Sequence, residues 1–223
     1  MSTPVKNSFK EIVQTCGFIS VIGALYFLLS VLLLGFVQPG YNHVIDTISV
    51  LVLGKYGWIQ QINFVVLAVS FGCLGIGLGL FFYKKFLNRI TAGFLLLSLC
   101  VIFVLLFKAD PVDRTQIKLV TLHSQAGLIH LSTTFVMVIL IPLFFIDLIK
   151  KLFGSNQNKG LARYTIFVIL FNVIFGILWF YCRRVGVGFE IKGIWQKVLA
   201  LNVLIWMMVM GKWLYKQDYK KLL

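Results

Sequence analysis

The sequence predicts an all-α protein, a polytopic bundle of six membrane-spanning helices. Of its 223 residues, 60% are hydrophobic and only 13% are charged, whereas a soluble domain is about 45–50% apolar and about 25% charged. Six runs come close to or exceed the ~20 apolar residues with which a helix crosses the ~30 Å hydrocarbon layer. These runs lack the polar/apolar alternation of barrel strands. The composition thus excludes a disordered chain and an ordinary cytosolic enzyme.

The six spans follow one another within a single integral membrane domain that covers residues 1–223. We expect them at residues 14–37, 58–82, 90–107, 119–146, 164–182 and 194–215. Pro39-Gly40 ends the first span, and Pro111 prevents the third from continuing. Between the fourth and fifth spans, residues 154–160 read as a flexible connector.

The segment after the first span predicts one further, shorter element. Residues 38–53 are too apolar for a free loop, so a short interfacial helix is expected there. On a helix, His43, Asp46 and Thr47 would share one face, because they are three and four residues apart. This face is either an amphipathic cap turned to water or one side of a site turned inward.

Basic residues flank the spans unevenly. If the N-terminus is inside, the cytoplasmic segments hold Lys6, Lys10, Lys84, Lys85, Arg89, Lys150, Lys151, Lys159, Arg163, Lys212, Lys216, Lys220 and Lys221. The smaller outer set is Lys55, Lys108, Arg114, Lys118, Arg183, Arg184, Lys192 and Lys197. The positive-inside rule then predicts cytoplasmic termini, and the inner cations would attract anionic lipids. The net charge of +14 is thus an orientation signal, and no nucleic-acid partner is expected.

All three histidines and four of the seven acidic residues fall on the predicted outer side. They are His43, His123, His130, Asp46, Asp110, Asp113 and Glu190. A charged side chain at a helix centre in the bilayer costs roughly 2.5–3.5 kcal/mol, so this placement is informative. The candidate catalytic or metal-binding residues are Asp46, Asp110 and His130. The candidate ligand-binding residues are His43, Ser49, His123, Gln196 and Lys197.

Two of these candidates lie on the predicted fourth span. His123 and His130 would share one helical stripe with their backbones ~10 Å apart, too far for both to bind one zinc ion through ligand atoms ~2 Å from it. His130 is the deeper one, and its simplest interpretation is a buried histidine bonded to a carboxylate or carbonyl. At the sixth span, Lys197 either snorkels to the surface or pairs with an inward aspartate.

Several of these landmarks occur together in a known family. They are Asn42, Asp46 and Ser49 after span one, Phe107 and Asp110 after span three, Gly127 and His130 in span four, and Gly193, Gln196 and Lys197 at span six. In this order, from about Gln14 to the sixth span, the chain resembles the bacterial six-span family catalogued as Domain of Unknown Function 998. It departs from the family pattern at Lys108, where a proline is usual, and at Lys197, where an arginine is usual. The resemblance implies the fold, an outward-facing site and a bacterial cytoplasmic membrane, and it brings no established activity.

Three functions remain open on the sequence. In the first, the protein has a structural or accessory role or binds a small ligand or lipid, and its polar cluster is a hydrogen-bond network. Alternatively it is a transporter of a small solute or lipid, which needs a path to the inner face. The third alternative is a metal-dependent hydrolase of a lipid or amide, which requires Asp46, Asp110 and His130 to converge on one cavity. Zinc suits such a mixed oxygen and nitrogen ligand set. Protein partners are not predicted.

Overall fold

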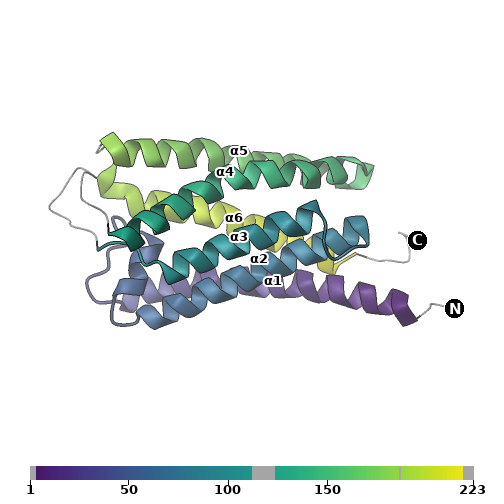
Figure 1. The fold of residues 1–223 in the computed structure, drawn as a ribbon, viewed down its shortest axis with the longest axis horizontal. Helices are drawn as coiled ribbons and strands as arrows, with labels where there is room; N and C mark the ends of the chain where they lie inside the picture. The colour runs from purple at the N-terminus through teal and green to yellow at the C-terminus, as the bar shows by residue number, and fades with distance from the viewer. Residues whose placement is uncertain (1–3, 112–123, 186, 218–223) are drawn as a thin grey trace.

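The computed structural model describes residues 4–111, 124–185 and 187–217, and six long helices dominate it (Figure 1). The elements are α1 (Pro4–Val37), η1 (Ile48–Leu53), α2 (Gly57–Tyr83), α3 (Arg89–Leu106), α4 (Gln125–Phe153), η2 (Asn156–Asn158), α5 (Lys159–Val185), η3 (Phe189–Ile191) and α6 (Lys192–Tyr215). All six α-helices are long and apolar enough to cross a membrane. The predicted all-α bundle of six spans is confirmed, and within the described ranges there is no strand.

The helices form a closed ring. Each packs against its neighbours in the sequence, and α6 returns to pack against α1. The start of α1 and the end of α6 lie on the same side of the bundle (Figure 1), which we call the terminal end. The opposite side, formed by η1, η3 and the start of α4, is called the polar end. The chain between α1 and η1 and the entries to α4 and α6 therefore meet at the polar end.

Two of the helix starts are fixed by side-chain caps. Asn88 accepts a hydrogen bond from the backbone N–H of Thr91 (3.1 Å), and Ser124 accepts one from that of Gly127 (2.9 Å), which satisfies N–H groups that have no partner in the first turn. The expected start of the fourth span, residue 119, lies outside the described residues. Helix α4 begins at Gln125, and it continues to Phe153 beyond the expected end at residue 146.

The short helix expected after α1 is present, but it begins too late to include His43, Asp46 and Thr47. The helical element there is the 3-10 helix η1, which spans Ile48–Leu53, and His43 lies before it in a turn. The side chain of Asn42 stabilises this turn, because its Oδ1 accepts the N–H groups of Val44 (2.8 Å) and Ile45 (3.4 Å). The residues His43 to Thr47 therefore share no helical face.

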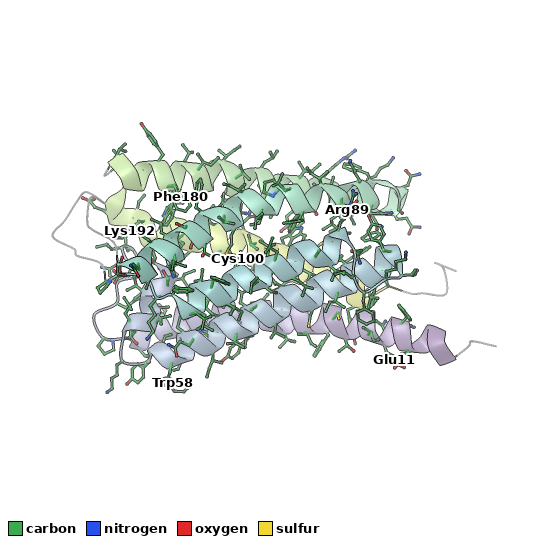
Figure 2. All side chains as sticks on the ribbon, in the orientation of Figure 1. Glu11, Trp58, Arg89, Cys100, Phe180 and Lys192 are labelled. Atoms are coloured by element: carbon green, nitrogen blue, oxygen red, sulfur yellow. The ribbon has the colours of Figure 1, made fainter. Side chains whose placement is uncertain are left out.

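Aromatic side chains fill the bundle toward the terminal end. Phe94, Phe145 and Trp206 are buried, with ring centroids 4.8–6.1 Å apart, distances typical of favourable aromatic pairs. They come from α3, α4 and α6, and we call them the aromatic floor. Trp58, by contrast, points away from the bundle on the outer side of α2 (Figure 2) and is 60% exposed, as expected for a side chain that faces lipid.

Candidate functional site

Lys197, in the second turn of α6, holds the loop that follows α1. Its ammonium group donates hydrogen bonds to the carbonyl oxygens of His43 (2.9 Å), Asp46 (2.7 Å) and Gly193 (3.4 Å). The same nitrogen lies 5.1 Å from the centre of the Tyr41 ring, close enough for a cation–π contact. The side chain is thus directed at the Asp46 loop, and its hydrogen bonds end on main-chain oxygens.

Asp46 is buried at the centre of this loop. Its carboxylate oxygen Oδ2 accepts the backbone N–H of Asn42 at 2.8 Å. The Tyr41 hydroxyl donates to the carbonyl oxygens of Asp46 (3.1 Å) and Thr47 (3.3 Å). Burial, together with the nearby Asp46 carboxylate, raises the pKa of Tyr41, so its hydroxyl keeps its proton and acts as a donor. The polar side chains of the loop thus brace the loop itself.

The His43 ring packs against the end of α1. It lies 4.6 Å from the ring of Phe36 and 5.3 Å from that of Tyr41, measured between centroids. Burial and, to a smaller extent, the Lys197 ammonium lower the pKa of His43, so the ring is neutral at pH 7. Its Nε2 is enclosed and has no hydrogen-bond partner among the described residues.

The loop also caps the start of α6. The carbonyl oxygen of Val44 accepts the N–H groups of Gly193 (3.0 Å) and Ile194 (3.1 Å), two of the donors that a helix leaves unpaired in its first turn. Gln196, one turn on, accepts the N–H of Ile48 through Oε1 at 2.7 Å. Because this atom accepts, it is the amide oxygen. The loop and η1 are therefore held against α6 by hydrogen bonds to their main-chain atoms.

A second polar group joins α3 to α4. Asp110 accepts hydrogen bonds from the hydroxyl (2.5 Å) and the backbone N–H (3.3 Å) of Ser124. Its carboxylate lies directly against the backbone of Gly127, where any Cβ atom would collide with it. Asp110 therefore sits at the positive end of α4, where a carboxylate is stabilised by the helix dipole. The glycine is required by this close approach.

His130 lies one turn further along α4 and is buried. Its Nδ1 is 2.8 Å from the carbonyl oxygen of Phe107. A carbonyl oxygen can only accept, so Nδ1 carries the proton, and in the neutral ring Nε2 is the acceptor nitrogen. The partner of Nδ1 is thus a carbonyl, one of the two kinds expected from the sequence. The His130 side chain also lines a cavity.

This cavity, which we call the inner cavity, lies among the helices and has a volume of about 210 Å³. Ser49, His130 and Gln196 line it toward the polar end, and Ile141 and Leu204 line it toward the terminal end. From His130 to Ile141, α4 rises by about 16 Å, at 1.5 Å per residue. Among the described lining residues there is no Asp, Glu, Lys or Arg. The inner cavity is therefore a long apolar space with neutral polar groups at one end.

One polar residue of the cavity was missed in the sequence analysis. Asn172, in the middle of α5, is buried and lines the inner cavity. Its Nδ2 donates to the carbonyl oxygen of Val168 at 2.9 Å, a bond within its own helix. The signal available in the sequence was a single asparagine inside an otherwise apolar span, since such residues face the bundle interior rather than lipid.

The candidate site residues thus fall into three places. Ser49, His130 and Gln196 meet at the inner cavity. His43, Asp46 and Lys197 form the docked loop, and Asp110 lies at the α3–α4 junction. Neither Asp46 nor Asp110 lines the inner cavity; Asp46 instead borders a shallow cleft of about 190 Å³ beside Pro111. His123 lies outside the described residues.

A metal centre would need several of these side chains in one place. Within the part of the chain that the structure describes, no three His, Cys, Asp or Glu side chains gather closely enough to hold a metal ion. Asp46 and Asp110 instead accept hydrogen bonds from the protein. The zinc-ligand set considered on the sequence is thus not assembled among the described residues.

Comparisons with known proteins bear on the fold and the family. A search of curated proteins and a search of solved structures each found no match to the chain. A scan against protein families matched residues 21–212, from the middle of α1 to the last turn of α6, to a family described as "Protein of unknown function (DUF998)". The match covers all six helices, as the resemblance noted on the sequence implied. The chain therefore belongs to the DUF998 family of multi-pass membrane proteins.

Proposed function

We propose that this protein binds a neutral amphipathic lipid, with its apolar chain in the inner cavity and its head at the polar end. The observation that carries the proposal is the cavity itself, an apolar space about 16 Å long by helix rise that is bordered at one end by Ser49, His130 and Gln196. Ligand sites are typically apolar with a few placed polar groups. A lipid with one acyl chain and a small head likewise has a long apolar part and a short polar part.

The absence of charge in the described lining favours a neutral head. A phosphate or carboxylate drawn into an apolar cavity without a cation would pay a desolvation cost with little compensation. At the polar end, Lys197 is bound to backbone oxygens of the docked loop. Uncharged hydroxyl, ester or amide groups, by contrast, need only hydrogen bonds, which amide and hydroxyl side chains supply.

Binding is favoured over the transport alternative by what lies below the cavity. The aromatic floor of Phe94, Phe145 and Trp206 occupies the space beyond Ile141 and Leu204, between the cavity and the terminal end. A transported solute would have to displace this packed cluster, whose dispersion contacts are lost if the rings separate. Catalysis by a metal is not favoured either, because the described acidic residues do not border the inner cavity.

A photoactivatable monoacylglycerol tests the binding proposal. The purified protein in lipid nanodiscs should be labelled on peptides that line the inner cavity, and an excess of unlabelled monoolein should compete. Replacing Ala200, which lines the cavity, with phenylalanine should lower cavity labelling at least about tenfold, because the added ring occupies the space that the chain needs. Mass spectrometry of the labelled peptides gives the measurement.

The matched control is Val198→Phe, on the same helix but exposed on its outer face. It should leave cavity labelling unchanged, and thermal unfolding should establish that both variants fold. If label in the wild-type protein is confined to outer faces such as that of Val198, and monoolein does not compete, the proposed function is wrong. This labelling and competition test uses the wild-type protein, so it decides the proposal even if Ala200→Phe does not fold.

We further propose that the terminal end faces the cytoplasm of a bacterium, where its basic residues contact anionic lipids. Each such cation near an anionic surface contributes about 1 kcal/mol. Cysteines introduced at Lys55, between η1 and α2, and at Asn156, between α4 and α5, give the test in a variant without the native cysteines. Both residues are exposed, and these two connections lie at opposite ends of the bundle (Figure 1). A membrane-impermeant maleimide on intact cells should label only Lys55→Cys; labelling of Asn156→Cys alone would reverse the orientation.

A further inference from the structure

The inner cavity contains an amide whose polar atoms are only partly used. Asn172 donates one hydrogen bond, from Nδ2 to the carbonyl oxygen of Val168. Because that partner can only accept, the bonded atom must be the nitrogen, and the oxygen Oδ1 is assigned by elimination. Oδ1 accepts no hydrogen bond from the described residues, and the atom is not completely buried. It therefore presents an acceptor to the cavity that Asn172 lines.

The depth of this acceptor follows from the register of α5 and α6. The Trp195 indole donates to the carbonyl oxygen of Phe175 (3.1 Å), and the Asn202 amide donates to that of Val168 (3.3 Å). Asn172 lies between these two levels, and Gln196 is adjacent to Trp195. This register places Asn172 level with residue 198 of α6, and therefore only about 3 Å deeper in the bundle than Gln196 at 1.5 Å per residue.

The amide of Gln196 is complementary. Its Oε1 is occupied by the N–H of Ile48, so the group that it can offer at the cavity wall is Nε2, a donor. An acyl chain alone would leave Asn172 Oδ1 and Gln196 Nε2 without partners, and an unpaired polar atom in an apolar cavity is unfavourable. A ligand that satisfies both amides presents an acceptor to Gln196 on α6 and a donor to Asn172 on α5, about 3 Å deeper.

We propose that the occupant of the inner cavity is a neutral lipid that carries both a hydrogen-bond acceptor and a hydroxyl or amide donor, such as a monoacylglycerol, and that Asn172 recognises the donor. This inference rests on the proposed function and adds the ligand class and a specificity residue. The head lies across the cavity between α6 and α5, so that the ester carbonyl accepts from Gln196 Nε2 while a hydroxyl donates to Asn172 Oδ1, and the acyl chain continues toward the terminal end. A lipid with the same chain and ester but no hydroxyl lacks the second bond.

Monoolein and methyl oleate make this comparison, because they share the oleoyl ester and differ in the hydroxyl groups. Their competition against the photoactivatable monoacylglycerol should give a wild-type preference for monoolein of about five- to tenfold, the affinity ratio expected of one hydrogen bond. Replacement of Asn172 by the similarly sized leucine should abolish the preference, by weakening monoolein and leaving methyl oleate equal or tighter.

Asn202→Leu is the matched control. Asn202 donates to the same Val168 carbonyl oxygen as Asn172, but it does not line the inner cavity, so its loss should keep the preference. Equal affinity of the two lipids for the wild-type protein, or a preference that survives in Asn172→Leu, overturns the inference while the proposed function stands. Failure of both lipids to compete for the cavity overturns the proposed function instead. The ratio of monoolein to methyl oleate affinity in the wild-type protein tests the inference even if Asn172→Leu does not fold.

Discussion

Replacing Trp206 with alanine is expected to lower the free energy of unfolding by about 3–5 kcal/mol, the range for large aromatic residues removed from a core. Trp206 is fully buried, and its ring is stacked on Phe94 and packed 4.8 Å from Phe145. Its indole N–H also donates to the hydroxyl of Thr165 at 3.1 Å. The substitution removes contacts to three helices at once and leaves a void in the aromatic floor. Unfolding in mixed micelles, followed by circular dichroism, measures the loss.

Trp58→Ala is the control for this prediction. Trp58 is 60% exposed on the outer side of α2, so its replacement removes mainly lipid contacts and should cost about 1 kcal/mol or less. Trp206→Phe should be intermediate, because it keeps a ring in the floor and loses the hydrogen bond to Thr165. Equal losses for Trp206→Ala and Trp58→Ala would show that the floor is not the packing centre of the terminal half.

The second large effect is expected for Gly193→Ala at the polar end. A Cβ atom there would lie 2.8 Å from the carbonyl oxygen of Val44 and closer still to that of Asp46. These are main-chain atoms, so the loop itself must move away. The movement would weaken the hydrogen bonds that Val44 accepts from α6 and those that Lys197 donates to the loop. At about 1 kcal/mol each, we expect a total loss of about 2–4 kcal/mol.

Two readouts separate loop undocking from general destabilisation. Hydrogen exchange at the amide of Asp46, which donates to the carbonyl oxygen of Asn42 at 2.8 Å, should accelerate in Gly193→Ala. Exchange in the middle of α2 should change less. Gly160→Ala serves as the control, because a Cβ atom at Gly160 meets nothing within 4 Å and alanine is the better helix former. Wild-type exchange at Asp46 in Gly193→Ala would contradict the docked arrangement.

Most of the fold was predictable because membrane helices are specified locally. A segment in hydrocarbon must satisfy its own backbone hydrogen bonds, so an apolar run of sufficient length predicts a helix without knowledge of its neighbours. The third span shows this, since 90–107 was expected and α3 is Arg89–Leu106. At the fourth span, the described helix begins after the Ser124 cap. Hydropathy does not locate such a cap, because the cap depends on a single side-chain contact.

The candidate site was only partly predictable, because its contacts join residues that are far apart in the sequence. The histidine later found at the cavity, His130, stood out as a rare ionisable residue within a span. Asn172 did not, because a neutral amide matters only when packing turns it toward a cavity. The direction of Lys197 was open for a similar reason, since the carbonyl oxygens it contacts, His43 and Asp46, lie more than 150 residues earlier.

By itself, then, the sequence determined that the chain crosses the membrane as six helices, which of its residues are costly to bury, and toward which end those residues gather. These properties depend on the transfer of individual segments from water to hydrocarbon. Only the tertiary structure decided that Asp46 braces a loop and Asp110 a helix start, and that neutral side chains surround the inner cavity. A cavity is a property of packing: helices from the whole chain border it, and its shape depends on how their side chains meet.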